Sequence, residues 1–245
     1  MKINKNDLNP NIKVMDRNNK SKATDKVHFM LWNLPSIETC PYATELCKKH
    51  CFGAKQENGY NPSIISSRAN AYNESLKPNF AKDMINYIEW YLQKKKVENK
   101  VCFFRIHGTG DFYSLEYMKK WIEITDHFKN DNRIVFQCYT KSMPYLLEVL
   151  KDRSIDEINI KIVWSIFDDT DPFYTAMAKK LGLTTFTAKP KKDVPNLIEN
   201  GYFLCEGDCG NCKACYKGKV PKIVIAFHWP TFVVGFFIIS FLSLD

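Results

Sequence analysis

Seven of the nine cysteines in this 245-residue chain fall into two tight groups, and thiolates at such spacing are typical metal ligands. The groups are Cys40, Cys47 and Cys51, and Cys205, Cys209, Cys212 and Cys215. Structural zinc usually takes two CxxC pairs separated by a dozen or more residues, whereas overlapping short spacings are typical of iron–sulfur loops. We therefore expect an iron–sulfur cluster at the second group, with zinc or a redox dithiol as alternatives.

The first group supplies three thiolates, which suit a [4Fe-4S] cluster with one iron left open. Such an iron can bind a cofactor, whereas a cluster held by four thiolates serves structure or electron transfer. The division of the seven cysteines stays open, because Cys205, His50 or His107 could supply a fourth ligand to the first group. We expect one or two clusters in all. The other cysteines, Cys102 and Cys138, stand alone in apolar runs and are expected to be core residues.

The elements that must position these groups are strands alternating with helices, a pattern that indicates a parallel sheet with right-handed crossovers. The predicted strands are 27–32, 101–106, 134–139, 158–167 and 184–187, with a sixth at 223–227. The predicted helices are 63–76, 80–96, 115–128, 143–150, 173–181 and 194–200. Because these strands are too few for a full eight-stranded barrel, we expect an α/β domain at 27–228. Its fold would be a partial parallel (β/α) barrel with a Cys-rich loop at 205–215, and an open doubly wound sheet is the alternative.

Polar residues follow each predicted strand, where parallel α/β folds carry their functional sites. They are Cys40, Cys47 and Cys51, then His107, Gly108, Gly110 and Asp111, then Lys141, Ser142, Ser165, Asp168, Asp169 and Lys189. Glycines on both sides of Thr109 would let the backbone approach a ligand closely. Asp111 is a candidate site residue, and its alternative role as a helix N-cap could equally be filled by Ser114.

Four segments of the chain together carry a family resemblance. They are Leu34-Pro35 with Cys40-Pro-Tyr-Ala-Thr44, Cys47 and Cys51, then Arg105-Ile-His107-Gly-Thr-Gly-Asp111-Phe112, then Tyr139-Thr-Lys141-Ser142, then the closing cysteines. In this combination the sequence resembles the gene product 88 family of phage and mobile-element proteins over residues 27–228. That resemblance implies little about activity.

A wider resemblance is to radical S-adenosylmethionine enzymes, which are partial (β/α) barrels with a three-cysteine loop after the first strand. It implies that Cys40, Cys47 and Cys51 hold an active cluster whose open iron binds S-adenosylmethionine. It also implies that the His107–Asp111 turn, with Gly108 and Gly110, orients the cofactor, and that the closing cysteines resemble an auxiliary cluster domain. Lys141, Ser165 and Lys189 would then face an unknown substrate as catalytic residues. The spacing here is Cx6Cx3C, whereas that superfamily usually has Cx3Cx2C.

Charge and the chain ends suggest partners. Residues 1–26 read as a basic flexible arm without a signal-peptide pattern, which favours a reducing cytoplasm. The arm and the net charge of +8 could contact nucleic acid, but a solvated end and a lysine-rich composition are the favoured explanations. Residues 229–245 form an apolar C-terminal extension, with a membrane or partner anchor and a core helix as alternatives. The competing function is a non-catalytic metal-binding accessory protein that contacts nucleic acid or a host protein.

Overall fold

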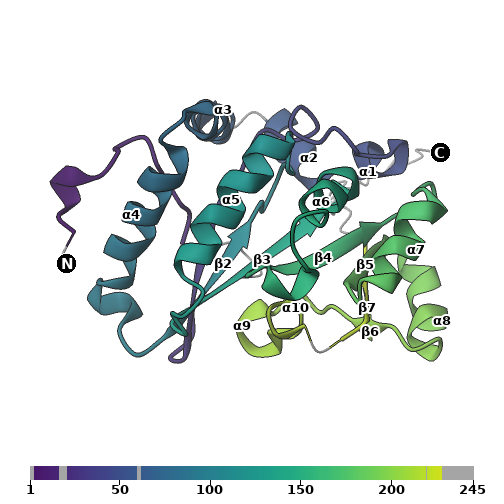
Figure 1. The fold of residues 1–245 in the computed structure, drawn as a ribbon. Coiled ribbons are helices and arrows are strands. Elements are labelled where there is room, and N and C mark those ends of the chain that lie inside the picture. Colours follow the sequence, from purple (N-terminus) through teal and green to yellow (C-terminus); the bar gives the residue numbers. More distant parts are fainter. Residues whose placement is uncertain (1–2, 17–20, 60–61, 219, 228–245) are drawn as a thin grey trace, which may run out of the picture.

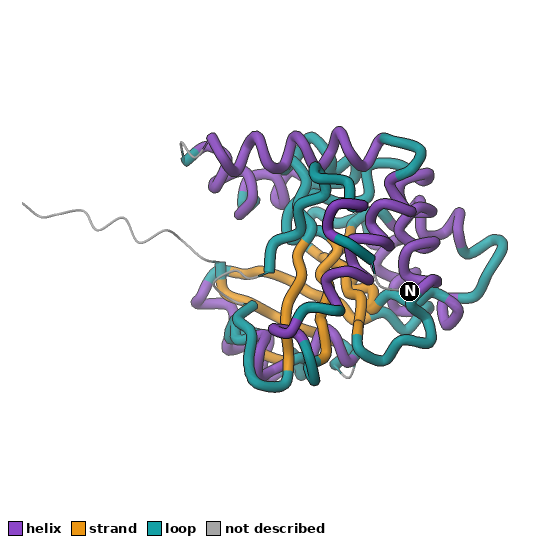
Figure 2. The backbone as a smooth tube through the Cα atoms, turned by 90° about the vertical axis from the view of Figure 1, so that its left-hand side faces the viewer, coloured by secondary structure: helices purple, strands orange, loops and turns teal. Residues whose placement is uncertain are grey.

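The computed structural model describes residues 3–16, 21–59, 62–218 and 220–227. These form a seven-stranded, all-parallel sheet in the order β1-β2-β3-β4-β5-β7-β6, which curls into a half-barrel flanked by helices (Figures 1 and 2). The strands are β1 (Val27–Leu31), β2 (Val101–Ile106), β3 (Ile134–Thr140), β4 (Lys161–Ile166), β5 (Thr184–Lys189), β6 (Phe203–Leu204) and β7 (Lys222–Ala226). The predicted partial parallel barrel is confirmed.

Helices follow the strands in the order expected of a β/α architecture. They are α1 (Glu45–Lys49), α2 (Phe52–Asn58), α3 (Pro62–Leu76), α4 (Phe80–Leu92), α5 (Leu115–His127), α6 (Met143–Val149), α7 (Pro172–Lys180), α8 (Val194–Glu199), α9 (Cys209–Cys212) and α10 (Ala214–Lys217). Short 3-10 turns are η1 (Lys5–Asp7), η2 (Lys95–Val97), η3 (Ile155–Glu157) and η4 (Lys191–Asp193). Figure 1 places α1, α2 and α3 along the upper side of the molecule, and α9 and α10 along the lower side.

The two faces of the sheet are buried by different parts of the chain. Alternate residues such as Met30 and Phe104 join the main core beneath α4, α5 and α6. On the opposite face, Phe29 and Phe103 pack against Tyr216 of α10. We call this second face the inner face. It carries Phe29, Phe103 and Arg105, with Val135, Gln137 and Tyr139 on β3. The C-terminal cysteine segment therefore covers the inner face of the half-barrel.

Part of the segment expected to be a flexible arm packs onto the domain. Ile12 is 3% exposed and belongs to the main core. Met15 exchanges two backbone hydrogen bonds with Leu31 on the outer edge of β1, at 2.9 and 2.7 Å. The Asn9 amide donates to carboxylates on α3 and α4. Residues 3–16 therefore brace the domain rather than extend from it.

The apolar C-terminal extension predicted for 229–245 lies outside the described residues, so its membrane and partner alternatives stay predictions. Within the part of the chain that the structure describes, no helix is long and apolar enough to cross a membrane.

Candidate functional site

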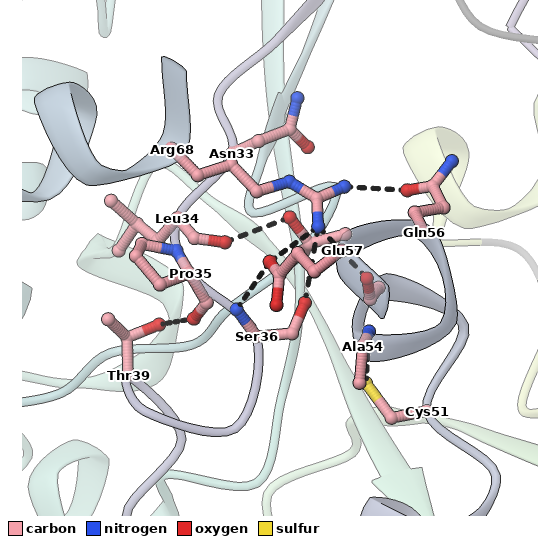
Figure 3. A network of polar contacts seen from close by, with 12 residues as sticks. Asn33, Leu34, Pro35, Ser36, Thr39, Cys51, Ala54, Gln56, Glu57 and Arg68 are labelled. Carbon is pink, nitrogen blue, oxygen red and sulfur yellow. Dashed lines mark hydrogen bonds and ion pairs between the residues drawn. The ribbon is translucent and has the colours of Figure 1, made fainter. Parts of the chain in front are cut away.

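The three-cysteine loop follows β1 and is held by a buried arginine from α3 (Figure 3). The Arg68 guanidinium donates to Glu57 at 2.6 Å, to the Gln56 side chain at 2.6 Å and to the Gly53 carbonyl at 3.0 Å. Glu57 in turn accepts from the Ser36 backbone at 2.9 Å. One side chain thus joins the start of the loop to α2, the helix that follows Cys51.

Close backbone packing also fixes this loop against the turn after β2. The Thr109 hydroxyl donates to the Leu34 carbonyl, and the Leu34 N–H donates to the Thr109 carbonyl. A Cβ atom at Gly110, whose φ is +83°, would lie 2.6 Å from both Leu34 Cβ and Thr39 Oγ1. A Cβ atom at Gly108 would lie 2.3 Å from Asn33 Oδ1. Close packing against the neighbouring loop therefore explains why Gly108 and Gly110 are glycines, and no bound ligand is needed to explain them.

Cys40, Cys47 and Cys51 are brought together within this loop. All three are partly buried, and the Cys51 sulfur accepts from the Ala54 N–H at the start of α2. Burial raises the pKa of Cys47 to about 11, opposed by the nearby Lys141 ammonium and reinforced by Cys51. Burial, Asp111 and the two other loop cysteines also raise the pKa of Cys40. The raised pKa values favour the protonated thiols of Cys40 and Cys47 even with Lys141 nearby, so a bound metal would supply the further positive charge that thiolates need.

Two contacts carry the loop across the carboxyl ends of the more distant strands. Asp169, in the turn after β4, accepts from the Leu46 N–H at 2.8 Å at the start of α1. The His50 ring stacks on Phe227, just after β7, with centroids 4.2 Å apart. The loop therefore spans from β1 to β7 over one end of the half-barrel.

Asp111 is a buried brace between the turn after β2 and the end of β3. Its Oδ1 accepts from the Thr140 hydroxyl at 2.6 Å and the Phe112 N–H at 2.7 Å, and its Oδ2 accepts from the Lys141 N–H at 2.7 Å. Ser114 caps α5 by accepting from the Tyr117 N–H, so Asp111 is not that cap. Since protein donors already occupy both oxygens, Asp111 acts here by joining two strand ends.

The pH dependence of stability should report the burial of the Asp111 carboxyl. Burial raises the pKa of Asp111 from 3.8 to about 6, against the hydrogen bonds from Lys141, Thr140 and Phe112, which lower it. Because the pKa is higher in the folded state than in the unfolded state, the contribution of Asp111 to the free energy of unfolding is complete below about pH 4. It is lost as the pH rises to about 6. We expect the wild type to lose up to about 3 kcal/mol from this group across that window. Asp111→Asn should remove this component, as measured by urea denaturation at a series of pH values. A stability difference between the two proteins that is constant from pH 4 to 6.5 would contradict the assignment.

His107 is a buried residue at the start of the turn after β2. It is 2% exposed, adopts a φ of +65°, and its Nε2 lies 3.0 Å from the Tyr117 hydroxyl. Its ring meets Phe112 edge to face, with centroids 4.6 Å apart. Burial lowers the pKa of His107 to about 3, so the imidazole is neutral at physiological pH.

The three residues expected to face a substrate also lie near the carboxyl ends of their strands. The Lys141 ammonium donates to the Ser165 carbonyl at 2.6 Å and lies 4.9 Å from the centre of the Phe167 ring. Lys141 is 5% exposed, and burial lowers its pKa. Lys189 forms an ion pair with Asp168. Of these residues, Lys141 is the one whose charge reaches the three-cysteine loop, through Cys47.

The second cysteine group lies on the inner face, apart from the first. Cys215 in α10 lies 3.0 Å from the Tyr139 hydroxyl, and Cys209 packs against the inner-face cluster. Burial raises the pKa of Cys215 to about 11, and Cys205 and Cys209 add to that rise. Cys212 is exposed. Cys205 thus lies near Cys215, with the second group.

Among the residues described, no three His, Cys, Asp or Glu side chains form a mononuclear metal site. The donor set itself, two groups of thiols that are partly buried except for Cys212, with a cationic residue beside each group, fits a metal–thiolate centre.

The fold and these groups define a parallel half-barrel protein with one cysteine group across the strand ends and another on the inner face. The family model for gene product 88 matches residues 11–180. The chain belongs to the gene product 88 family. No curated protein and no solved structure matches it significantly.

Proposed function

We propose that this protein is an iron–sulfur protein and acts as a radical S-adenosylmethionine-like enzyme on an unknown substrate. Cys40, Cys47 and Cys51 would hold a [4Fe-4S] cluster with one open iron. The observation that carries the proposal is the position of these three thiols across the carboxyl ends of a parallel half-barrel, beside buried Lys141. Sites in parallel β/α barrels are built at that end.

The surrounding residues support such a cluster in distinct ways. Lys141 places a positive charge near Cys47, which favours thiolates. Asp111 and Arg68 hold the loop and the neighbouring strand ends in place. Bound S-adenosylmethionine would supply the radical chemistry, and Lys141, Ser165 and Lys189 would border the substrate. Because Asp111 and His107 are engaged within the protein, the backbone of the 107–111 turn is the part left to orient the cofactor.

The alternative is a non-catalytic accessory protein, and a basic cleft at the opposite end of the sheet favours it. This cleft of about 700 Å³ is lined by Lys94, Lys95, Lys100 and Arg133 together with the acidic Glu98, near the beginnings of β2 and β3. Lysines and arginines around such a space suit a phosphate backbone. In this case both cysteine groups would be structural and would hold either iron–sulfur clusters or zinc. Both functions place the protein in a reducing compartment such as the cytoplasm.

Anaerobic purification tests the proposal. The isolated protein should be brown and contain iron and acid-labile sulfide, and its spectrum should change when S-adenosylmethionine is added. Cys47→Ala should abolish that change, because it removes a ligand of the open cluster. Cys102→Ala is the matched control, since it removes a buried thiol outside both groups and should leave the response intact.

Three outcomes separate the candidate functions. Stoichiometric zinc without sulfide, under conditions that load other clusters, would contradict the iron–sulfur proposal. Iron and sulfide without a response to the cofactor would favour the accessory protein. Salt-sensitive binding of a single-stranded or duplex oligonucleotide, weakened by Lys94→Glu and Lys100→Glu, would locate that alternative in the basic cleft.

A further inference from the structure

Arg105 is a cation on the inner face, and no carboxylate among the described residues pairs with it. The other arginines of the described chain each pair with one: Arg68 with Glu57, Arg133 with Asp131 and Arg153 with Asp126. The buried Arg105 Nε has no hydrogen-bond partner. Its guanidinium carbon lies 4.4 Å from the centre of the Tyr139 ring. Arg105 as a whole is partly buried, but its buried Nε–H needs an acceptor or an anion to offset its lost hydration, and the described residues place neither beside it.

The residues around Arg105 add further unsatisfied polar groups. Gln137 is its register partner on β3, is fully buried, and has no partner for either atom of its side-chain amide. The Tyr216 hydroxyl on α10 is also buried and unpaired. Around Arg105 the inner face therefore holds three buried donor groups and one acceptor, Gln137 Oε1, for which the described residues supply no partner. Buried polar groups are rarely left in that condition, so an acceptor belongs among them.

Sulfur atoms are the acceptors that the fold brings to this place. The Tyr139 hydroxyl lies 3.0 Å from Cys215 Sγ, and Cys209 packs against the inner-face cluster. The positive charge of Arg105 acts on both Cys209 and Cys215. Protonated thiols are weak acceptors and carry no charge, whereas metal-bound thiolates and cluster sulfides are negatively charged.

We infer that Cys205, Cys209 and Cys215 hold an anionic metal–thiolate centre on the inner face, with Arg105 as its counter-charge and Gln137 and Tyr216 as further donors. This rests on the metal-binding part of the proposed function and not on its enzymatic part. Arg105 is a positioning residue that acts through the sulfur ligands. An iron–sulfur cluster and zinc share this anionic thiolate chemistry, and the experiment distinguishes them.

The test compares Arg105→Gln and Arg105→Lys with the wild type as full-length chains, reconstituted anaerobically with iron and sulfide or with zinc alone. Arg105→Gln should lower the metal affinity of this group by about 10- to 100-fold in a chelator competition. Arg105→Lys keeps the charge and should restore a substantial part of it. Arg133→Gln is the control, because that arginine pairs with Asp131 at the surface. Cys215→Ala shows the result of losing a ligand.

Readouts other than activity separate this inference from a general loss of structure. If iron is bound, Arg105→Gln should also lower the reduction potential of the cluster, since the reduced state carries more negative charge. Zinc bound without iron, with the same dependence on Arg105, would support the inference while contradicting the iron–sulfur proposal. Metal retention equal to wild type in Arg105→Gln, or no metal lost in Cys215→Ala, would overturn it. The response of the first group to S-adenosylmethionine should be the same in the Arg105 variants and the wild type.

Discussion

Replacing Arg68 with alanine should lower the free energy of unfolding by about 3–5 kcal/mol, the usual cost of breaking a buried ion pair from one side. The Arg68 side chain is 7% exposed and ties Glu57, Gln56 and the Gly53 carbonyl together. Its loss leaves the Glu57 carboxylate with a single donor, the Ser36 N–H. Urea denaturation of both proteins measures the difference.

The same substitution should loosen the three-cysteine loop more than the rest of the domain. Alkylation of Cys51 under native conditions should become faster, whereas alkylation of Cys138, buried in β3, should stay slow. Arg153→Ala is the matched control, because that arginine forms a half-exposed pair with Asp126 and should cost less than about 1 kcal/mol. Equal losses in the two variants would contradict the assignment of Arg68 as the main support of the loop.

Gly110→Ala should destabilise the protein by about 2–5 kcal/mol, because two costs add at one position. The backbone has a φ of +83°, which disfavours any side chain, and the new Cβ would overlap Leu34 Cβ and Thr39 Oγ1. Gly182 supplies a control with a φ of +66° and no atom within 4 Å of its added Cβ. Gly182→Ala should show the backbone cost alone, about 1–2 kcal/mol. If denaturation gives the same loss for both, the two loops do not pack as tightly as described.

Most of the fold followed from the sequence, because strand and helix periodicities are local. Five predicted strands match β1 to β5 in place and order, and the sixth matches β7 within one residue. The predicted strand at 158–167 begins only at Lys161, although Ile158 and Ile160 before it are buried in the main core. β6 was missed because two residues, Phe203 and Leu204, carry no readable alternation.

The site was less predictable because its roles depend on contacts between distant segments. The sequence pointed to Asp111 and Gly110, but their roles depend on Thr140, 29 residues away, and on the packing of Leu34. Arg68 and Arg105 were not predicted as site residues. Arg68 lies in an ordinary helix pattern, so nothing in the sequence distinguishes it. Arg105 could have been identified, because it is the one charged residue in an otherwise apolar strand.

The bridge between Met15 and Leu31 has a consequence for how the protein behaves at high concentration. An outer strand presents a row of unpaired amide and carbonyl groups on which a second chain can add by β-augmentation. Met15 occupies both groups of Leu31 on that edge. At the other end of the sheet β6 is two residues long, which is too short to template an added strand. Edge-to-edge aggregation is thereby disfavoured at both edges of the half-barrel. The N-terminal segment protects the β1 edge, and the short length of β6 protects the other.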